Sequence, residues 1–208
     1  MSTAVQRAEQ AGTNKFEQRR QQLAAAALDA IAERGFARTG LRDISARTNL
    51  STGILHYYFT DKDDLIAQAI WQYKSECARR YDSIVATAAT AQELSERFGE
   101  EMSHTLQDEA DMHRLWYDLR NQALFDDGFR DTIVAIDDLL ADMVWAVVLR
   151  HAELRSVAPA VDRGTAYALF DGVFLNALIA FMRGDMQVLN DLRIRVAALL
   201  STSAPLSQ

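Results

Sequence analysis

The stretch that decides the fold is GFARTGLRDISARTNLSTGILHYYFTDK, residues 35–62. It contains two short helix-forming segments, Leu41–Thr48 and Thr52–Phe59, which flank a turn at Asn49. Asparagine accepts the left-handed conformation that tight turns use, and Ser51 is a favourable N-cap for the second segment. Two short helices joined by a turn of three or four residues are typical of a helix-turn-helix unit.

A longer helix is predicted immediately before this unit, from Lys15 to Gly35. Its apolar positions recur at steps of three and four residues, and Ala24–Ala27 has high helix propensity. Glycine commonly follows the last residue of a helix, so Gly35 marks the end. Residues 1–14 are polar and aperiodic, and we expect them to form a flexible tail.

The remainder of the chain has helical periodicity and no alternating strand pattern of useful length. Both prolines, Pro159 and Pro205, lie in the last quarter of the sequence, which leaves long helices unbroken before them. We therefore predict an all-α protein of about nine helices. The helices expected after residue 62 are Leu65–Ile84, Glu93–Leu106, Met112–Phe125, Phe129–Arg150, Ala166–Arg183 and Met186–Leu200.

The composition excludes several classes of protein. With 208 residues, 49% of them hydrophobic, the chain can bury a sizeable core, and 9 glycines and 2 prolines exclude a collagen-like chain. A single cysteine, Cys77, cannot form an internal disulfide. No secretory signal is visible, and the longest apolar run, Ala166–Met182, falls short of the roughly 20 residues of a membrane span and contains Asp171. We expect a buried core helix there, and a soluble, cytoplasmic protein with no membrane partner.

Charge is distributed unevenly along the chain. The formal net charge is −7, yet residues 34–60 carry four arginines against Asp43 alone, and the acidic excess lies after residue 60. A basic segment on an acidic body favours one surface that binds a polyanion. A chance cluster of solvated arginines would give the same count.

Taken in order, these features resemble the DNA-binding domain of the TetR family of bacterial transcriptional regulators. The matching positions are Gly35-Phe36, Thr39, Arg42-Asp43-Ile44, Leu50-Ser51, Gly53, Leu55, Tyr58-Phe59 and Lys62. The resemblance implies a three-helix helix-turn-helix domain over residues 15–62 and a helical ligand-binding and dimerisation domain over 63–201, followed by a tail over 202–208. His56 and Tyr57 depart from the family pattern, which commonly has tyrosine and then histidine or tryptophan there. Gly40 departs from it too, standing where serine or threonine usually caps the second helix.

The segment Thr52–Phe59 is predicted to enter the major groove of DNA. Leu55 and Phe59 are four residues apart and should face the domain core, so the other side chains of the segment remain for DNA. Ile54 suits a thymine methyl group, and the resemblance places Arg42 where arginine can reach a guanine. The residues predicted to bind DNA are Thr39, Arg42, Ser51, Thr52, Gly53, Ile54, His56, Tyr57 and Lys62.

The resemblance also implies a small-molecule pocket in the body of the protein and a twofold homodimer. Aromatic and methionine side chains with a few polar groups suit such a pocket, although they suit an ordinary core as well. The residues predicted to bind the ligand are Met102, His104, Trp116, Arg120, Met143, Asp171, Phe174 and Asn176. The residues predicted to form the dimer interface are Phe170, Val173, Ala177, Phe181, Leu192 and Val196.

The function implied is that of a repressor which binds a palindromic operator as a dimer and is released by a small-molecule inducer. No catalytic motif is visible, and the four histidines lack the spacing of metal ligands, so we expect neither an enzyme nor a cofactor nor a metal site. Two alternatives remain open. One is a small all-α ligand-binding protein or enzyme in which the helix-turn-helix is structural, and the other is a transcriptional activator.

Overall fold

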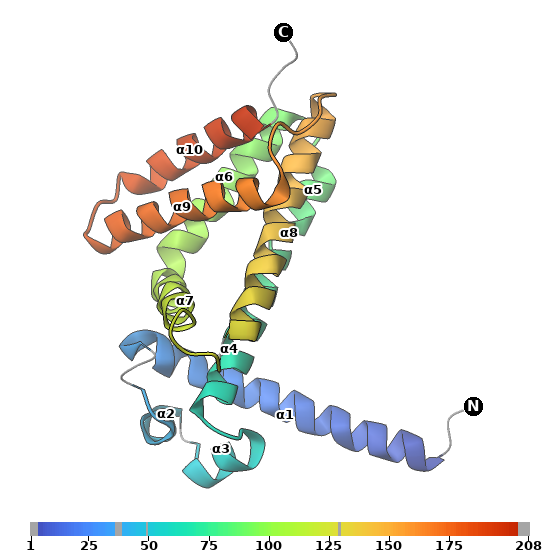
Figure 1. The fold of residues 1–208 in the computed structure, drawn as a ribbon, viewed down its shortest axis with the longest axis vertical. Helices are drawn as coiled ribbons and strands as arrows, with labels where there is room; N and C mark the ends of the chain where they lie inside the picture. Colours follow the sequence, from blue (N-terminus) through green and yellow to red (C-terminus); the bar gives the residue numbers. More distant parts are fainter. Residues whose placement is uncertain (1–3, 36–38, 49, 129, 204–208) are drawn as a thin grey trace. The chain divides into compact units, whose positions relative to one another are not determined.

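The computed structural model describes residues 4–35, 39–48, 50–128 and 130–203, and within these ranges it contains helices and no strands (Figure 1). The prediction of an all-α fold is confirmed. The helices are α1 (Ala4–Arg34), α2 (Leu41–Thr48), α3 (Thr52–Tyr58), α4 (Lys62–Arg79), α5 (Asp82–Thr87), α6 (Ala91–Asp108), α7 (Ala110–Gln122), α8 (Arg130–Leu154), α9 (Arg163–Met182) and α10 (Val188–Ser203).

Several helix boundaries differ by a few residues from expectation, and two differences are larger. Helix α1 begins at Ala4, so residues 4–14, which we expected to form an irregular tail, are helical. The helix expected over Leu65–Ile84 is divided between α4 and α5. The described residues therefore form ten helices instead of the expected nine or so. The chain turns at Arg80, whose guanidinium donates to Thr105 Oγ1 (2.6 Å) and to Glu109 Oε1 (2.7 Å). These contacts with distant parts of the chain accompany the break, and no glycine or proline marks it in the sequence.

The chain separates into two compact units. Unit 1 consists of residues 1–73 and 115–133, and unit 2 consists of residues 74–114 and 134–208. These structural boundaries do not follow the expected functional boundary after residue 62, which stays a prediction. In unit 1, α1 contributes Leu23, Ala27 and Ile31 to a core that also contains Ile44 of α2 and Leu55 of α3, all of them buried. This small core holds the two short helices against α1.

In unit 2, α6 and α9 both pack along α10 (Figure 1). The Phe98 ring lies at the centre of this packing, with its centroid 5.0 Å from that of Tyr81 and 5.9 Å from that of Phe170. Gly99 allows the backbones to approach, because a Cβ there would lie 3.3 Å from the Cα of Arg193. The unit therefore has a tightly packed core of its own.

Helix α9 differs from the buried core helix that we expected. Among the described helices it alone is long and apolar enough to span a membrane, by length and composition only, and 28% of its most apolar window is buried in the protein. One face packs inward through residues that include Phe170 and Phe174. The opposite face is also largely apolar, and its residues follow at steps of four and three: Ala168, Gly172, Leu175, Ile179 and Met182.

Candidate nucleic-acid interface

Helix α3 is fixed at its N-terminus by the turn that precedes it. The Ser51 hydroxyl accepts a hydrogen bond from the backbone N–H of Ile54 (3.1 Å), which is the N-cap contact expected from the sequence. The hydroxyl groups of Ser45 and Thr52 lie 3.1 Å apart and link α2 to α3. The first turn of α3 therefore has a defined orientation relative to α2.

Helix α2 is capped in a different way from the one expected. The Gly40 N–H donates to Asp43 Oδ2 (2.9 Å), so a carboxylate in the first turn compensates for the missing side chain at the cap position. Thr39 donates through its hydroxyl to the carbonyl of Gly35 (2.8 Å) and is only 2% exposed. Thr39 is therefore part of the domain core, and its burial contradicts the predicted contact with DNA.

The two faces of α3 divide as expected. Leu55 and Phe59 are buried, and Phe59 follows the last helical residue as the C-cap instead of ending the helix. Ile54 is 40% exposed and Tyr57 is 71% exposed. The other predicted DNA-binding residues fall into an exposed group, Arg42, Ser51, Gly53 and His56, and a half-buried group, Thr52 and Lys62. Apart from Thr39, none of the predicted DNA-binding residues is buried.

An aromatic cluster anchors the end of α3 to α1. The Tyr58 ring centroid lies 4.8 Å from that of Phe16, and the Tyr57 centroid lies 6.0 Å from Phe16 and 4.9 Å from Tyr58. Tyr57 is thus held by ring contacts on one side while most of its surface faces solvent. The ring contacts already restrict the rotation of this tyrosine, so donating a hydrogen bond to a phosphate costs it less side-chain entropy.

Acidic residues at the start of α4 complete the domain. Arg20 of α1 forms an ion pair with Asp64, and its guanidinium lies 5.3 Å from the centroid of the Phe59 ring. Burial and the neighbouring carboxylate of Asp61 raise the pKa of Asp63, against the opposing charge of Lys62. The aromatic C-cap of α3 is therefore fixed from α1, and Lys62 lies among carboxylates that reduce its attraction for phosphate.

Comparison with known proteins finds similarity to bacterial transcriptional regulators. A sequence model described as bacterial regulatory proteins of the tetR family matches residues 23–69, from the buried part of α1 into α4. The chain is 25% identical over 168 residues to the HTH-type transcriptional regulator PksA of Bacillus subtilis, covering 78% of this chain and 80% of PksA. Residues 23–69 therefore carry the sequence pattern of the TetR family. Over 48 residues, 23% of this chain and 25% of the relative, the chain is also 48% identical to the HTH-type transcriptional regulator BetI of Burkholderia thailandensis.

Solved structures confirm the fold. A TetR-family regulator from Rhodococcus sp. superimposes with a TM-score of 0.71 at 18% identity, covering 90% of this chain and 99% of that one. The transcriptional regulator FadR from Bacillus subtilis, in complex with stearoyl-CoA, gives a TM-score of 0.70 at 19% identity, with 88% and 97% covered. The chain therefore has the all-helical fold of these regulators, with the N-terminal helix-turn-helix domain that was predicted.

The residues predicted to bind a ligand are divided between the two units. Met102 and Phe174 are buried in unit 2, where Met143 and Asp171 are half-buried. Trp116 and Arg120 belong to unit 1, and the Arg120 guanidinium lies 5.7 Å from the centroids of both Trp116 and Tyr117. Two of the residues predicted to bind the ligand, His104 and Asn176, are exposed. The Asn176 amide donates a hydrogen bond to the Gly172 carbonyl (2.8 Å).

Most of the predicted dimer residues lie inside the protomer. Phe170, Ala177, Leu192 and Val196 are buried in the core of unit 2, so no partner can contact them and these four assignments are wrong in this structure. Val173 and Phe181 are half-buried. The stripe of α9 that was predicted to face a partner, which includes Phe170 and Ala177, packs into the protomer instead.

A buried polar cluster in unit 2 was missed. Lys74 Nζ lies 3.4 Å from Nδ1 of His113, whose Nε2 lies 3.1 Å from the hydroxyl of Thr105. The Phe174 ring covers His113 at a centroid distance of 4.7 Å. One signal was available in the sequence, since Lys74 lies four residues after Ile70 and four before Ala78 and so interrupts an apolar stripe. Buried charge in an apolar unit is a feature that functional sites share.

The cluster predicts a dependence of stability on pH. Burial, followed by the charges of Lys74 and Arg80, holds the pKa of His113 well below its usual value. The unfolded state therefore binds more protons, so the stability present above about pH 6.5 is lost as the pH falls, by at most about 1.4 kcal/mol per pH unit for one histidine. We expect urea unfolding between about pH 7.5 and about pH 5.5 to show this slope, and His113→Gln to reduce it. A slope unchanged in His113→Gln, or reduced equally by His104→Gln at an exposed histidine of the same unit, would contradict the assignment.

Proposed function

We propose that this regulator is a homodimeric repressor that binds a palindromic operator through α3 of each protomer and is released by a small molecule. The observation that carries the proposal is that α3 has one buried face and one exposed face. Leu55 is buried, and Ile54 and Tyr57 are exposed beside it. A recognition helix needs such a division, because its inner face fixes the angle at which its outer face meets the bases.

The proposed contacts follow from the exposed chemistry. Ile54 would contact a thymine methyl group, and Arg42 would reach a guanine, a bidentate contact worth about 1–3 kcal/mol of discrimination. The Tyr57 and Ser51 hydroxyl groups would contact phosphates. Gly53 supports a close approach of the backbone, because a Cβ there would meet nothing nearer than the Ser51 hydroxyl at 4.0 Å.

The proposed dimer uses the outward face of α9. Ile179 and Met182 are large and exposed there, and Ile194 of α10 is also exposed. Apolar side chains of this size on one face are typical of a surface that a partner covers. Twofold symmetry would place two copies of α3 one DNA turn apart, about 34–36 Å, and the operator would then be palindromic.

The proposed effector binds unit 2. FadR from Bacillus subtilis was solved with stearoyl-CoA, and that neighbour supports a small-molecule ligand for this chain. Helix α4 starts in unit 1 at Lys62 and ends in unit 2 at Arg79, so a ligand that displaces its second half would act on the helix that follows α3. The ligand can shift the population only by its differential affinity for the two states, typically about 1–3 kcal/mol.

Selection from random double-stranded DNA at low salt tests the proposal. We expect an enriched palindrome whose half-site centres lie about one helical turn apart, and two protomers per duplex at saturation. Absence of any enriched palindrome would overturn the dimeric operator. A reporter gene placed behind the selected site distinguishes a repressor from an activator. Deleting the gene that encodes this protein raises reporter expression if the protein is a repressor and lowers it if the protein is an activator.

A further inference from the structure

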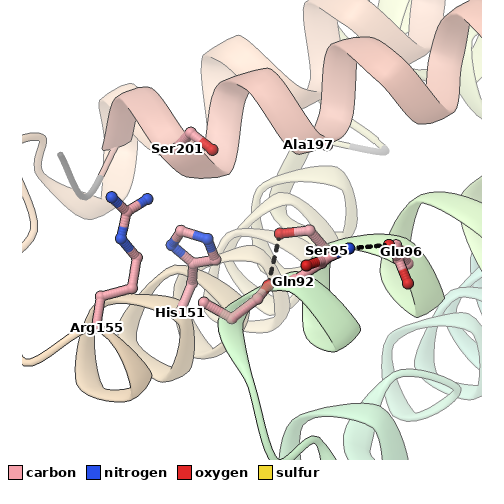
Figure 2. Close-up of a pocket in the computed structure, with 8 residues that line it drawn as sticks. Gln92, Ser95, Glu96, His151, Arg155, Ala197 and Ser201 are labelled. Atoms are coloured by element: carbon pink, nitrogen blue, oxygen red, sulfur yellow. Dashed lines mark hydrogen bonds between the residues drawn. The ribbon is translucent and has the colours of Figure 1, made fainter. Parts of the chain in front are cut away.

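A hollow of about 430 Å³ opens between α6, α10 and the C-terminal end of α8, and all of its lining residues belong to unit 2. Ala91 and Ala197 form the apolar part of its lining, and Gln92, His151 and Arg155 provide polar groups. Figure 2 shows the His151 ring of α8 and the guanidinium of Arg155, which follows the end of α8, pointing toward Ser201 on α10. The hollow is much larger than one inorganic ion, so it suits a molecule with both a polar end and an apolar body.

His151 provides an unsatisfied polar atom at this place. The residue is only 2% exposed, and its Nδ1 has no hydrogen-bond partner among the described residues. A buried polar atom without a partner costs free energy, commonly about 1–3 kcal/mol. Nδ1 itself has almost no accessible surface, so a ligand reaches it only when the ring turns toward the hollow. A hydrogen bond accepted from Nδ1 in that position would remove the cost.

The electrostatics favour an anion. Arg155 lies one helical turn after His151, and the first turn of α6, which contains Ala91 and Gln92, adds the partial positive charge of a helix N-terminus. Two carboxylates of α6 oppose this charge. Glu96 is exposed and accepts a hydrogen bond from the Gln92 amide (2.8 Å), and Glu93, in the same first turn, accepts one from the Ala89 N–H (3.0 Å) and pairs with Arg97. The residues that α10 contributes to the lining carry no charge.

We propose that this hollow binds a small organic carboxylate, with its oxygens held by the Arg155 guanidinium and by Nδ1 of His151 and its apolar body between Ala91 and Ala197. Guanidinium matches carboxylate with two parallel hydrogen bonds. Burial and the charge of Arg155 lower the pKa of His151, so the empty site holds a neutral ring that can donate one N–H.

Benzoate binding to the purified full-length protein tests the site, with benzamide as its neutral counterpart. We expect benzoate to shift the backbone amide resonances of Gln92 and Ser201, and benzamide to bind about tenfold more weakly or worse. Arg155→Gln removes the cation and Ser201→Leu fills the hollow from an exposed position. Each change is expected to weaken benzoate binding about tenfold or more, with the circular dichroism spectrum unchanged.

Arg183→Gln is the matched control, because it removes an exposed arginine of the same unit outside the hollow. It should bind benzoate as the wild type does. Benzoate binding that survives Arg155→Gln, equal binding of benzamide, or shifts confined to residues outside the hollow would each overturn the proposal. None of these outcomes bears on operator binding, which is measured separately by selection.

Discussion

Ile54→Asp will abolish specific operator binding while the protein stays folded. Ile54 is the third residue of α3 and is 40% exposed on the proposed DNA face. A carboxylate there would meet base edges and phosphates, and like charges brought together at an interface cost several kcal/mol. We expect the affinity for the selected operator to fall at least about a hundredfold, equivalent to about 2.7 kcal/mol.

The same change should leave the fold stable, because the first turn of a helix favours a negative side chain by about 0.3–1 kcal/mol. The loss of binding is measured by fluorescence anisotropy with labelled operator, and stability by urea unfolding. Leu124→Asp is the matched control, since it adds the same charge to unit 1 at a residue that is 72% exposed. Equal losses in the two variants would show that net charge, and not the face of α3, governs binding.

The helix-turn-helix was predictable because its determinants are local. The observed bounds of α2, Leu41–Thr48, are those expected from the sequence, and Ser51 caps α3 as expected. Leu55 and Phe59 are buried because the four-residue spacing places both on one face of a helix. Each of these features needs only a few neighbouring residues, so one sequence contains the whole signal.

The dimer surface was not predictable in the same way. Helix α9 is apolar on two faces, so its sequence does not show which stripe packs inward. Phe170 and Ala177 satisfied the periodicity of an interface and are buried instead, whereas Ile179 is exposed. Packing against α6 and α10 sets the rotation of the helix, and such contacts between distant segments cannot be inferred from spacing.

Polar positions raise a related difficulty. His104 and Asn176 lie in or beside apolar stripes, yet both are exposed, while Lys74 is buried. A long side chain can bury its stem and satisfy its charge among distant partners such as His113. Sequence alone therefore identifies unusual polar residues and leaves open whether each one points inward.

Ile179→Asp will separate the proposed dimer and weaken operator binding as a consequence. Ile179 is 52% exposed near the middle of the outward face of α9. In a twofold interface one substitution acts in both protomers, so two carboxylates would enter the same apolar contact. Unpaired buried charges of this kind cost several kcal/mol, and we expect a monomer by sedimentation at micromolar concentration. Leu149→Asp adds the same charge at an exposed leucine of α8 and should remain a dimer.

The concentration dependence of DNA binding separates the two variants. A dimer places its second α3 beside the second half-site, and that effective concentration commonly gives a gain of about 10²–10⁴ in affinity. Ile179→Asp loses this gain but keeps an intact α3, so raising the protein concentration should restore occupancy of the operator. Ile54→Asp keeps the dimer and loses the contact itself, so its binding curve should shift to higher concentration and stay hyperbolic, whereas Ile179→Asp should show the steeper curve of two monomers that bind together. Failure of Ile179→Asp to dissociate the dimer would move the interface away from α9.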